Sequence, residues 1–152
     1  MKLPKIAMVI ATGFALTASS VSAQTFLCIA DQSTGFSYSQ ASRSWETKRF
    51  NVSDNRYIIR KSNRNPYLWE VNQFGKDEPF LPFSGCKDDF NDFGFLHCAG
   101  LGGELTFNRE NGRYILYYMG QYAAYNPNSD VPDYRKDGGD TPFIEIGKCS
   151  KI

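Results

Sequence analysis

The sequence predicts an all-β domain that closes on itself as a small antiparallel barrel and carries two disulfides. Three observations lead to this prediction. Aromatic and β-branched residues gather in short runs, Asn, Asp, Ser, Gly and Pro separate these runs, and four cysteines occur in a chain of 152 residues that begins like an exported protein. Runs and separators of this kind are typical of short strands joined by tight turns.

The first 23 residues have the pattern of a secretory signal peptide. Lys2 and Lys5 supply a positive start, residues 6–18 are mostly apolar, and small residues lead up to Ala23. The apolar stretch is too short for a lasting anchor, because a helix needs about 20 residues to cross the hydrocarbon. We therefore expect cleavage after Ala23, no membrane attachment afterwards, and one domain over residues 24–152 in the periplasm or outside the cell.

The charge balance after cleavage argues against a nucleic-acid partner. The chain has 17 basic and 16 acidic residues, and loss of Lys2 and Lys5 leaves the acids in excess by one. The remaining basic residues are dispersed along the chain, whereas nucleic-acid binding depends on concentrated positive charge.

The four cysteines indicate two disulfides formed in an oxidising compartment. Of the three possible pairings we expect Cys28–Cys149, which would tie the two ends of the domain together, and Cys86–Cys98, which would close a short hairpin. Zinc binding is the competing use of these residues. It is disfavoured because the cysteines lack the close spacing of a zinc knuckle and the single histidine, His97, adjoins Cys98.

Nine strands are expected in the domain, over Phe26–Ala30, Gly35–Ser39, Trp45–Phe50, Arg56–Lys61, Tyr67–Phe74, Phe93–Cys98, Glu104–Asn108, Arg113–Gln121 and Phe143–Cys149. The stretch 123–141 is rich in Asn, Asp, Pro and Gly and predicts a long surface loop. A covalent tie between the first and last strands favours a closed up-and-down barrel, lipocalin-like in shape, because closure hides the strand edges. A two-sheet sandwich is the alternative.

An internal echo supports the antiparallel meander. Residues 50–59 and 107–116 share the pattern Phe-Asn, four residues, then Arg-Tyr-Ile and a second aliphatic residue. In the second copy Asn111-Gly112 is a strong turn signal, since both residues tolerate the positive φ of tight hairpins. Each copy is therefore expected to form a hairpin.

Side chains that could do chemistry are few. His97 lies between Leu96 and Cys98 without a serine elbow or free thiol, so we expect a structural histidine. The acidic side chains are expected to be solvated loop charges, and they are Asp88, Asp89, Asp92, Asp130, Asp133, Asp137 and Asp140. The group from Asp130 to Asp140 has part of the ligand spacing of a calcium-binding loop, but it lacks the glycine and the terminal glutamate of such a loop. We expect no metal and no cofactor.

The aromatic residues are the most informative for function. If residues 113–121 form a strand, Tyr117 lies on an apolar face opposite to the apolar face of Tyr114. One face must fill the core, and the other must be covered or presented to a ligand or partner. The aromatic residues expected at such a binding surface are Tyr117, Tyr122, Tyr125, Tyr134 and Trp69. Filling a small β core is the alternative use of these rings.

Residues 26–36 (FLCIADQSTGF) and 143–149 (FIEIGKC) resemble the ends of small exported proteins of Gram-negative bacteria that have no assigned function. This resemblance implies a periplasmic location and no particular activity. From the residues themselves we expect a non-enzymatic binding module for a small apolar ligand or a protein partner. A hydrolase with paired carboxylates is the alternative, and it requires Asp88, Asp89 or Asp92 to meet Glu104 or Glu145 in a cleft.

Overall fold

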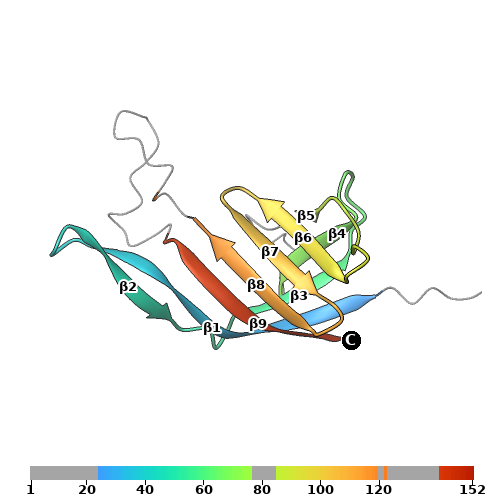
Figure 1. Cartoon of the computed structure of the whole chain (residues 1–152), viewed down its shortest axis with the longest axis horizontal. Helices are drawn as coiled ribbons and strands as arrows, with labels where there is room; N and C mark the ends of the chain where they lie inside the picture. Colours follow the sequence, from blue (N-terminus) through green and yellow to red (C-terminus); the bar gives the residue numbers. More distant parts are fainter. Residues whose placement is uncertain (1–23, 77–84, 120–121, 123–140) are drawn as a thin grey trace, which may run out of the picture.

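A computed structural model describes residues 24–76, 85–119, 122 and 141–152, which form one antiparallel sheet curled nearly into a barrel (Figure 1). The predicted all-β, barrel-like fold is confirmed. The expected signal peptide and most of the expected long loop lie outside the described residues. The strands are β1 (Thr25–Ser39), β2 (Ser44–Phe50), β3 (Arg56–Lys61), β4 (Trp69–Gln73), β5 (Gly85–Cys86), β6 (Phe95–Gly100), β7 (Gly103–Asn108), β8 (Arg113–Tyr118) and β9 (Phe143–Lys151).

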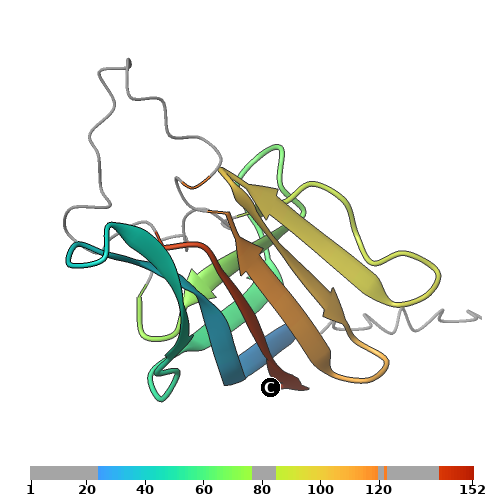
Figure 2. The same cartoon turned by 60° about the vertical axis from the view of Figure 1, so that its left-hand side comes forward.

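The first and last strands lie together in the middle of the sheet. The strand order is β5-β4-β3-β1-β9-β8-β7-β6, with β2 also paired to β1, and Figure 2 shows β9 beside both β1 and β8. On the edge of β1 away from β9, residues 25–29 pair with β3 and residues 33–39 pair with β2. The β1–β2 hairpin therefore extends away from the strands β3 to β7 (Figure 1).

Strand β1 is longer than the sequence predicted. The strands expected at 26–30 and 35–39 are one continuous strand, although Asp31, Ser33 and other turn-forming residues lie between them. The ladder to β9 runs through this stretch with a register shift between Ala30 and Gln32. Pairing with β9 across this stretch, joined by β2 from Ser33 onward, thus overrides the local preference of these residues for a turn.

The two copies of the internal echo have different structures. The second copy is the predicted hairpin, with Asn108 opposite Arg113 and Gly112 at a φ of 66°. The hairpin prediction is wrong for the first copy, because β2 and β3 both pair with β1 rather than with each other. The tyrosines at equivalent positions of the two copies, Tyr57 and Tyr114, nevertheless pack edge to face inside the barrel, with their ring centroids 6.1 Å apart.

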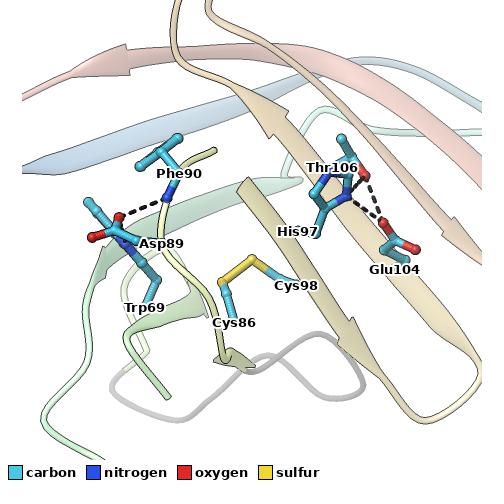
Figure 3. Close-up of a disulfide and its surroundings, with 8 residues drawn as sticks. All are labelled: Trp69, Cys86, Asp89, Phe90, His97, Cys98, Glu104 and Thr106. Carbon is cyan, nitrogen blue, oxygen red and sulfur yellow. Dashed lines mark hydrogen bonds and ion pairs between the residues drawn. A yellow bond between two sulfur atoms is a disulfide. The ribbon is translucent and has the colours of Figure 1, made fainter. Parts of the chain in front are cut away.

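Both predicted disulfides are present, and they link different kinds of strand pair: one joins neighbouring strands and the other joins the two strands at the ends of the sheet order. Cys28 and Cys149 are directly opposite each other in the β1–β9 ladder. Cys86 and Cys98 join β5 to β6, the two strands at the ends of the sheet order (Figure 3). Within the described residues no hydrogen-bonded ladder connects β5 and β6, so this disulfide bridges the open seam of the barrel instead of closing a hairpin.

Large side chains fill the inside of the barrel. The ring of Phe26 packs edge to face against Phe107 at 4.8 Å, and Trp69 packs against Phe90 at 5.0 Å. The other buried members of this cluster include Ile59, Val71, Leu96, Leu105 and Leu116. A packed interior is typical of a barrel of this size. Space for a ligand must therefore be sought on the outer surface.

Candidate functional site

The outward face of β8 and β9 is apolar where a surface strand is usually polar. Ile144 and Ile146 on β9 are 50% and 45% exposed. In the register, Tyr117 lies opposite Ile144 and Ile115 lies opposite Ile146, which makes the apolar surface continuous across the two strands. In other proteins, large contiguous apolar surfaces are common at sites of contact with ligands or partners.

A groove of about 770 Å³ lies at one end of this face, between the β1–β2 hairpin and the adjoining ends of β8 and β9. We call it the aromatic groove. None of the described residues that line it is charged, and most are aromatic or large aliphatic side chains. They are Thr34, Gly35, Phe36, Trp45, Thr47, Tyr117, Tyr118, Met119, Tyr122, Pro142, Phe143 and Ile144.

Strand alternation and one glycine build the groove. Phe36 lies opposite Thr47, and Tyr38 lies opposite Trp45, so alternate residues of the hairpin share one face. A side chain at Gly35 would stand only 2.1 Å from the carbonyl oxygen of Pro142, and the backbone N–H of Phe36 donates to that oxygen at 3.0 Å. Gly35 thus lets the entry to β9 approach β1 closely enough to join the two walls.

Aromatic contacts fix the far wall of the groove. The ring of Trp45 meets Tyr38 edge-on at 5.6 Å and Tyr122 at 5.5 Å. Tyr118, which extends the inward row of β8, packs against Phe143 at 6.0 Å. The first two contacts join β1 and β2 to the segment after β8, and the third joins β8 to β9.

A second, more polar cavity of about 480 Å³ adjoins the aromatic groove, and we call it the polar cavity. The two share Thr34 and Ile144 in their walls. The remaining residues that line the polar cavity are Asp31, Gln32, Ser33, Arg49, Phe50, Val52 and Ile146.

A polar cluster lies beside Tyr117, which lines the aromatic groove. Nδ1 of His97 lies 2.9 Å from a carboxylate oxygen of Glu104 and 3.1 Å from the hydroxyl of Thr106, and Thr106 donates to the same carboxylate (Figure 3). Tyr117 donates to the other carboxylate oxygen at 3.4 Å. The hydrogen bond from His97 is the main cause that lowers the pKa of Glu104, against the effect of partial burial. The cluster therefore ties Tyr117 to β6 and β7.

Glu145 is a buried carboxylate on the inner face of β9. Its side chain is fully buried, and it accepts hydrogen bonds from Asn55 Nδ2 and from the hydroxyl of Tyr114. Burial, followed by the negative charge of Glu145, raises the pKa of the Tyr57 and Tyr114 phenols far above their usual range. Both phenols therefore remain protonated donors to this carboxylate. Sequence reasoning missed this site, although the echo had singled out the two tyrosines.

The acidic residues that a hydrolase would need do not converge. Asp89 binds Lys61 and the indole N–H of Trp69, each at distances of 2.7–2.8 Å. Glu104 faces outward beside His97, whereas Glu145 lies inside the barrel. Within the part of the chain that the structure describes, no group of three or more His, Cys, Asp or Glu side chains could hold a metal ion. The acids expected at 130, 133, 137 and 140 lie outside the described residues.

Two of the residues predicted at a binding surface come together in the structure. Tyr117 and Tyr122 both line the aromatic groove. Trp69 is buried in the core, and Tyr125 and Tyr134 lie outside the described residues. Sequence reasoning did not select Phe36 or Phe143 for this surface. The alternation of aromatic residues along 36–38 was an available signal for Phe36, because it puts rings on one face of the hairpin.

No protein-family model, curated protein or solved structure matches the chain. Its function must therefore be inferred from its own residues. The two disulfides indicate an oxidising, non-cytoplasmic environment. In the ranges that the structure describes, no helix has the length and apolar character needed to cross a membrane.

Proposed function

We propose that this chain is an exported binding module, periplasmic or secreted, which holds a small and largely apolar ligand in the aromatic groove. The observation that carries the proposal is a groove of about 770 Å³ whose described walls bear no charge. Sites for small molecules usually enclose about 300–1,000 Å³ and are lined by apolar and aromatic side chains with a few polar groups. The signal-like N-terminus and the two disulfides support export.

Two of the polar side chains at the groove, Thr34 and Tyr117, already have hydrogen-bond partners within the protein. The hydroxyl of Thr34 donates to the backbone carbonyl of Lys48, and the hydroxyl of Tyr117 donates to Glu104. A strongly polar ligand would lose its hydration without gaining enough hydrogen bonds in return. An apolar ligand gains from burial against the rings and loses little.

The groove is preformed on strands. Most of the residues that line it belong to β1, β2, β8 and β9, and the Cys28–Cys149 disulfide links two of these strands. A rigid site loses less conformational entropy when a ligand binds. This is the arrangement expected of a binding protein that does not need to close over its ligand.

Titration with N-phenyl-1-naphthylamine tests the proposal, because the fluorescence of this neutral apolar probe rises when it leaves water. We expect saturable binding by the wild-type protein. The substitution Trp45→Ala should weaken binding about tenfold, since it removes one aromatic wall. Tyr122→Ala should also weaken it.

The matched control is Phe93→Ala, which removes a ring that is 77% exposed and does not line the groove. It should leave probe affinity unchanged. Circular dichroism would verify that each variant is folded. Absence of saturable binding, or equal affinity in wild type and both groove variants, would contradict the proposal.

A further inference from the structure

We infer that the ligand is a single-chain amphiphile with a carboxylate head, whose hydrocarbon chain lies in the aromatic groove and whose head meets Arg49 in the polar cavity. This inference rests on the proposed function and specifies the chemistry of the ligand. Three observations support it: the two cavities adjoin, their charge is unequally distributed, and the positive charge at the polar end has no ion-pair partner among the described residues.

The two cavities form one path across the outer surface. Arg49 on β2 lies opposite Thr34 on β1, Thr34 lies opposite Ile144 on β9, and Ile144 lies opposite Tyr117 on β8. Arg49 lines the polar cavity, Tyr117 lines the aromatic groove, and the two residues between them line both. Three strand spacings of about 4.8 Å separate the ends of this row, or roughly 14 Å. A ligand of extended shape can therefore contact both ends at once.

Of the two charged residues that line the polar cavity, Arg49 is the one without an ion pair among the described residues. No carboxylate of residues 24–76, 85–119, 122 or 141–152 forms an ion pair with the exposed side chain of Arg49. Asp31 is the acid that lines the same cavity, and its carboxylate already faces Lys148 Nζ at 3.9 Å. Glu104 lines neither cavity and is bound by His97 and Thr106.

The chemistry of Arg49 selects an anionic and planar head. A guanidinium presents its N–H donors in a fork that fits the two oxygens of a carboxylate. The groove beyond Thr34 and Ile144 offers rings, Met119 and no charge, which suits an alkyl chain. An anion at one end and a hydrocarbon at the other together describe a fatty-acid-like molecule.

Displacement of bound N-phenyl-1-naphthylamine tests this inference with three ligands of the same chain length: dodecanoate, dodecan-1-ol and dodecylammonium, each kept below its micellar concentration. For wild-type protein we expect dodecanoate to displace the probe at the lowest concentration and dodecylammonium at the highest. Arg49→Gln should raise the dissociation constant of dodecanoate about tenfold, as expected for loss of a hydrogen bond between charged groups. It should leave that of dodecan-1-ol unchanged.

Lys48→Gln is the matched control, because it removes the neighbouring cation on β2, which lines neither cavity. It should change none of the three affinities. Equal displacement by the three ligands, a preference for dodecylammonium, or equal effects of Arg49→Gln and Lys48→Gln would overturn the inference and leave the apolar groove as the binding site. If neither the probe nor any of the three ligands binds, the proposed function itself fails.

Discussion

The two faces of β9 invert the usual distribution of polar and apolar residues. On the inner face Glu145 is fully buried, whereas on the outer face its two neighbours Ile144 and Ile146 are about half exposed. The buried carboxylate has partners inside the protein, since Tyr114 and Asn55 donate to it. The exposed isoleucines have no comparable compensation among the described residues. A buried polar or exposed apolar residue therefore points to function only where no other part of the protein pairs with it or covers it.

The largest effects are expected on the inner face, beginning with its disulfide. Replacing Cys28 and Cys149 together by alanine removes a link between residues 121 positions apart, which the chain-entropy model values at about 5 kcal/mol. The matched pair Cys86→Ala and Cys98→Ala opens a link of separation 12, valued at about 3 kcal/mol. Urea unfolding at neutral pH measures both.

A larger loss for the Cys86–Cys98 pair would show that bridging the barrel seam matters more than loop length. In that case the β1–β9 ladder would maintain the contact between the first and last strands without its disulfide. The two faces of β9 would then differ in their effect on stability only through Glu145.

Glu145→Ala should lower the free energy of unfolding by about 3 kcal/mol. The reason is that it leaves at least two buried donors, the Tyr114 hydroxyl and Asn55 Nδ2, without an acceptor, and each such group costs about 1–3 kcal/mol. Ile144→Ser, on the other face of the same strand, should cost about 1 kcal/mol or less, because Ile144 is half exposed. Equal losses in the two variants, measured by urea unfolding, would show that the faces of β9 do not differ as described.

The outer face should affect binding instead of stability. Ile144→Ser should weaken binding of N-phenyl-1-naphthylamine about fivefold, because Ile144 lines both cavities and each lost kcal/mol of apolar contact is worth roughly that factor. Ile115→Ser is the control, since Ile115 has similar exposure on the neighbouring strand but lines neither cavity. If both variants lose affinity equally, the ligand spreads over the whole apolar face.

The smallest effect is expected at Asp89, a carboxylate at the edge of the core that already has hydrogen-bond partners. A hydrogen bond from Lys61, together with those from Trp69 and the Phe90 N–H, lowers the pKa of Asp89 to about 2 despite partial burial. The folded pKa lies below the unfolded value of about 3.9, so the stabilisation exists above that value and disappears as the pH falls towards 2. Asp89 is more than half exposed, so solvent screening keeps its contribution below about 1 kcal/mol.

Asp89→Asn should therefore destabilise the protein slightly at pH 7, and the difference from wild type should shrink between pH 4 and pH 2. Urea unfolding at a series of pH values measures this difference. Asp92→Asn is the control, because Asp92 is exposed and has no hydrogen bond or ion pair to the residues that the structure describes. A constant difference across the pH range would mean that the ionised form of Asp89 is not specifically stabilised.

The sequence by itself determined most of the strands and the presence of two disulfides, whereas the choice among the three possible pairings belongs to the tertiary structure. The strand expected at Arg56–Lys61 matches β3, and the Asn111-Gly112 turn lies where its dihedral preferences place it. These features depend on local alternation, on turn chemistry and on the even number of cysteines. Each can be recognised without knowledge of distant neighbours.

Only the tertiary structure decided how the strands combine and which face carries the groove. Alternation assigns Tyr114 and Tyr117 to opposite faces of β8, but closure of the sheet decides that Tyr114 points inward. Likewise β1 is one strand because its ladder to β9 continues through the expected turn. Glu145 is buried because donors from β8 and from the segment before β3 reach it. The groove joins residues near positions 35, 45, 118 and 143, which lie far apart in the chain. Local preferences contain no information about such contacts, because the free energy that forms them comes from packing between strands.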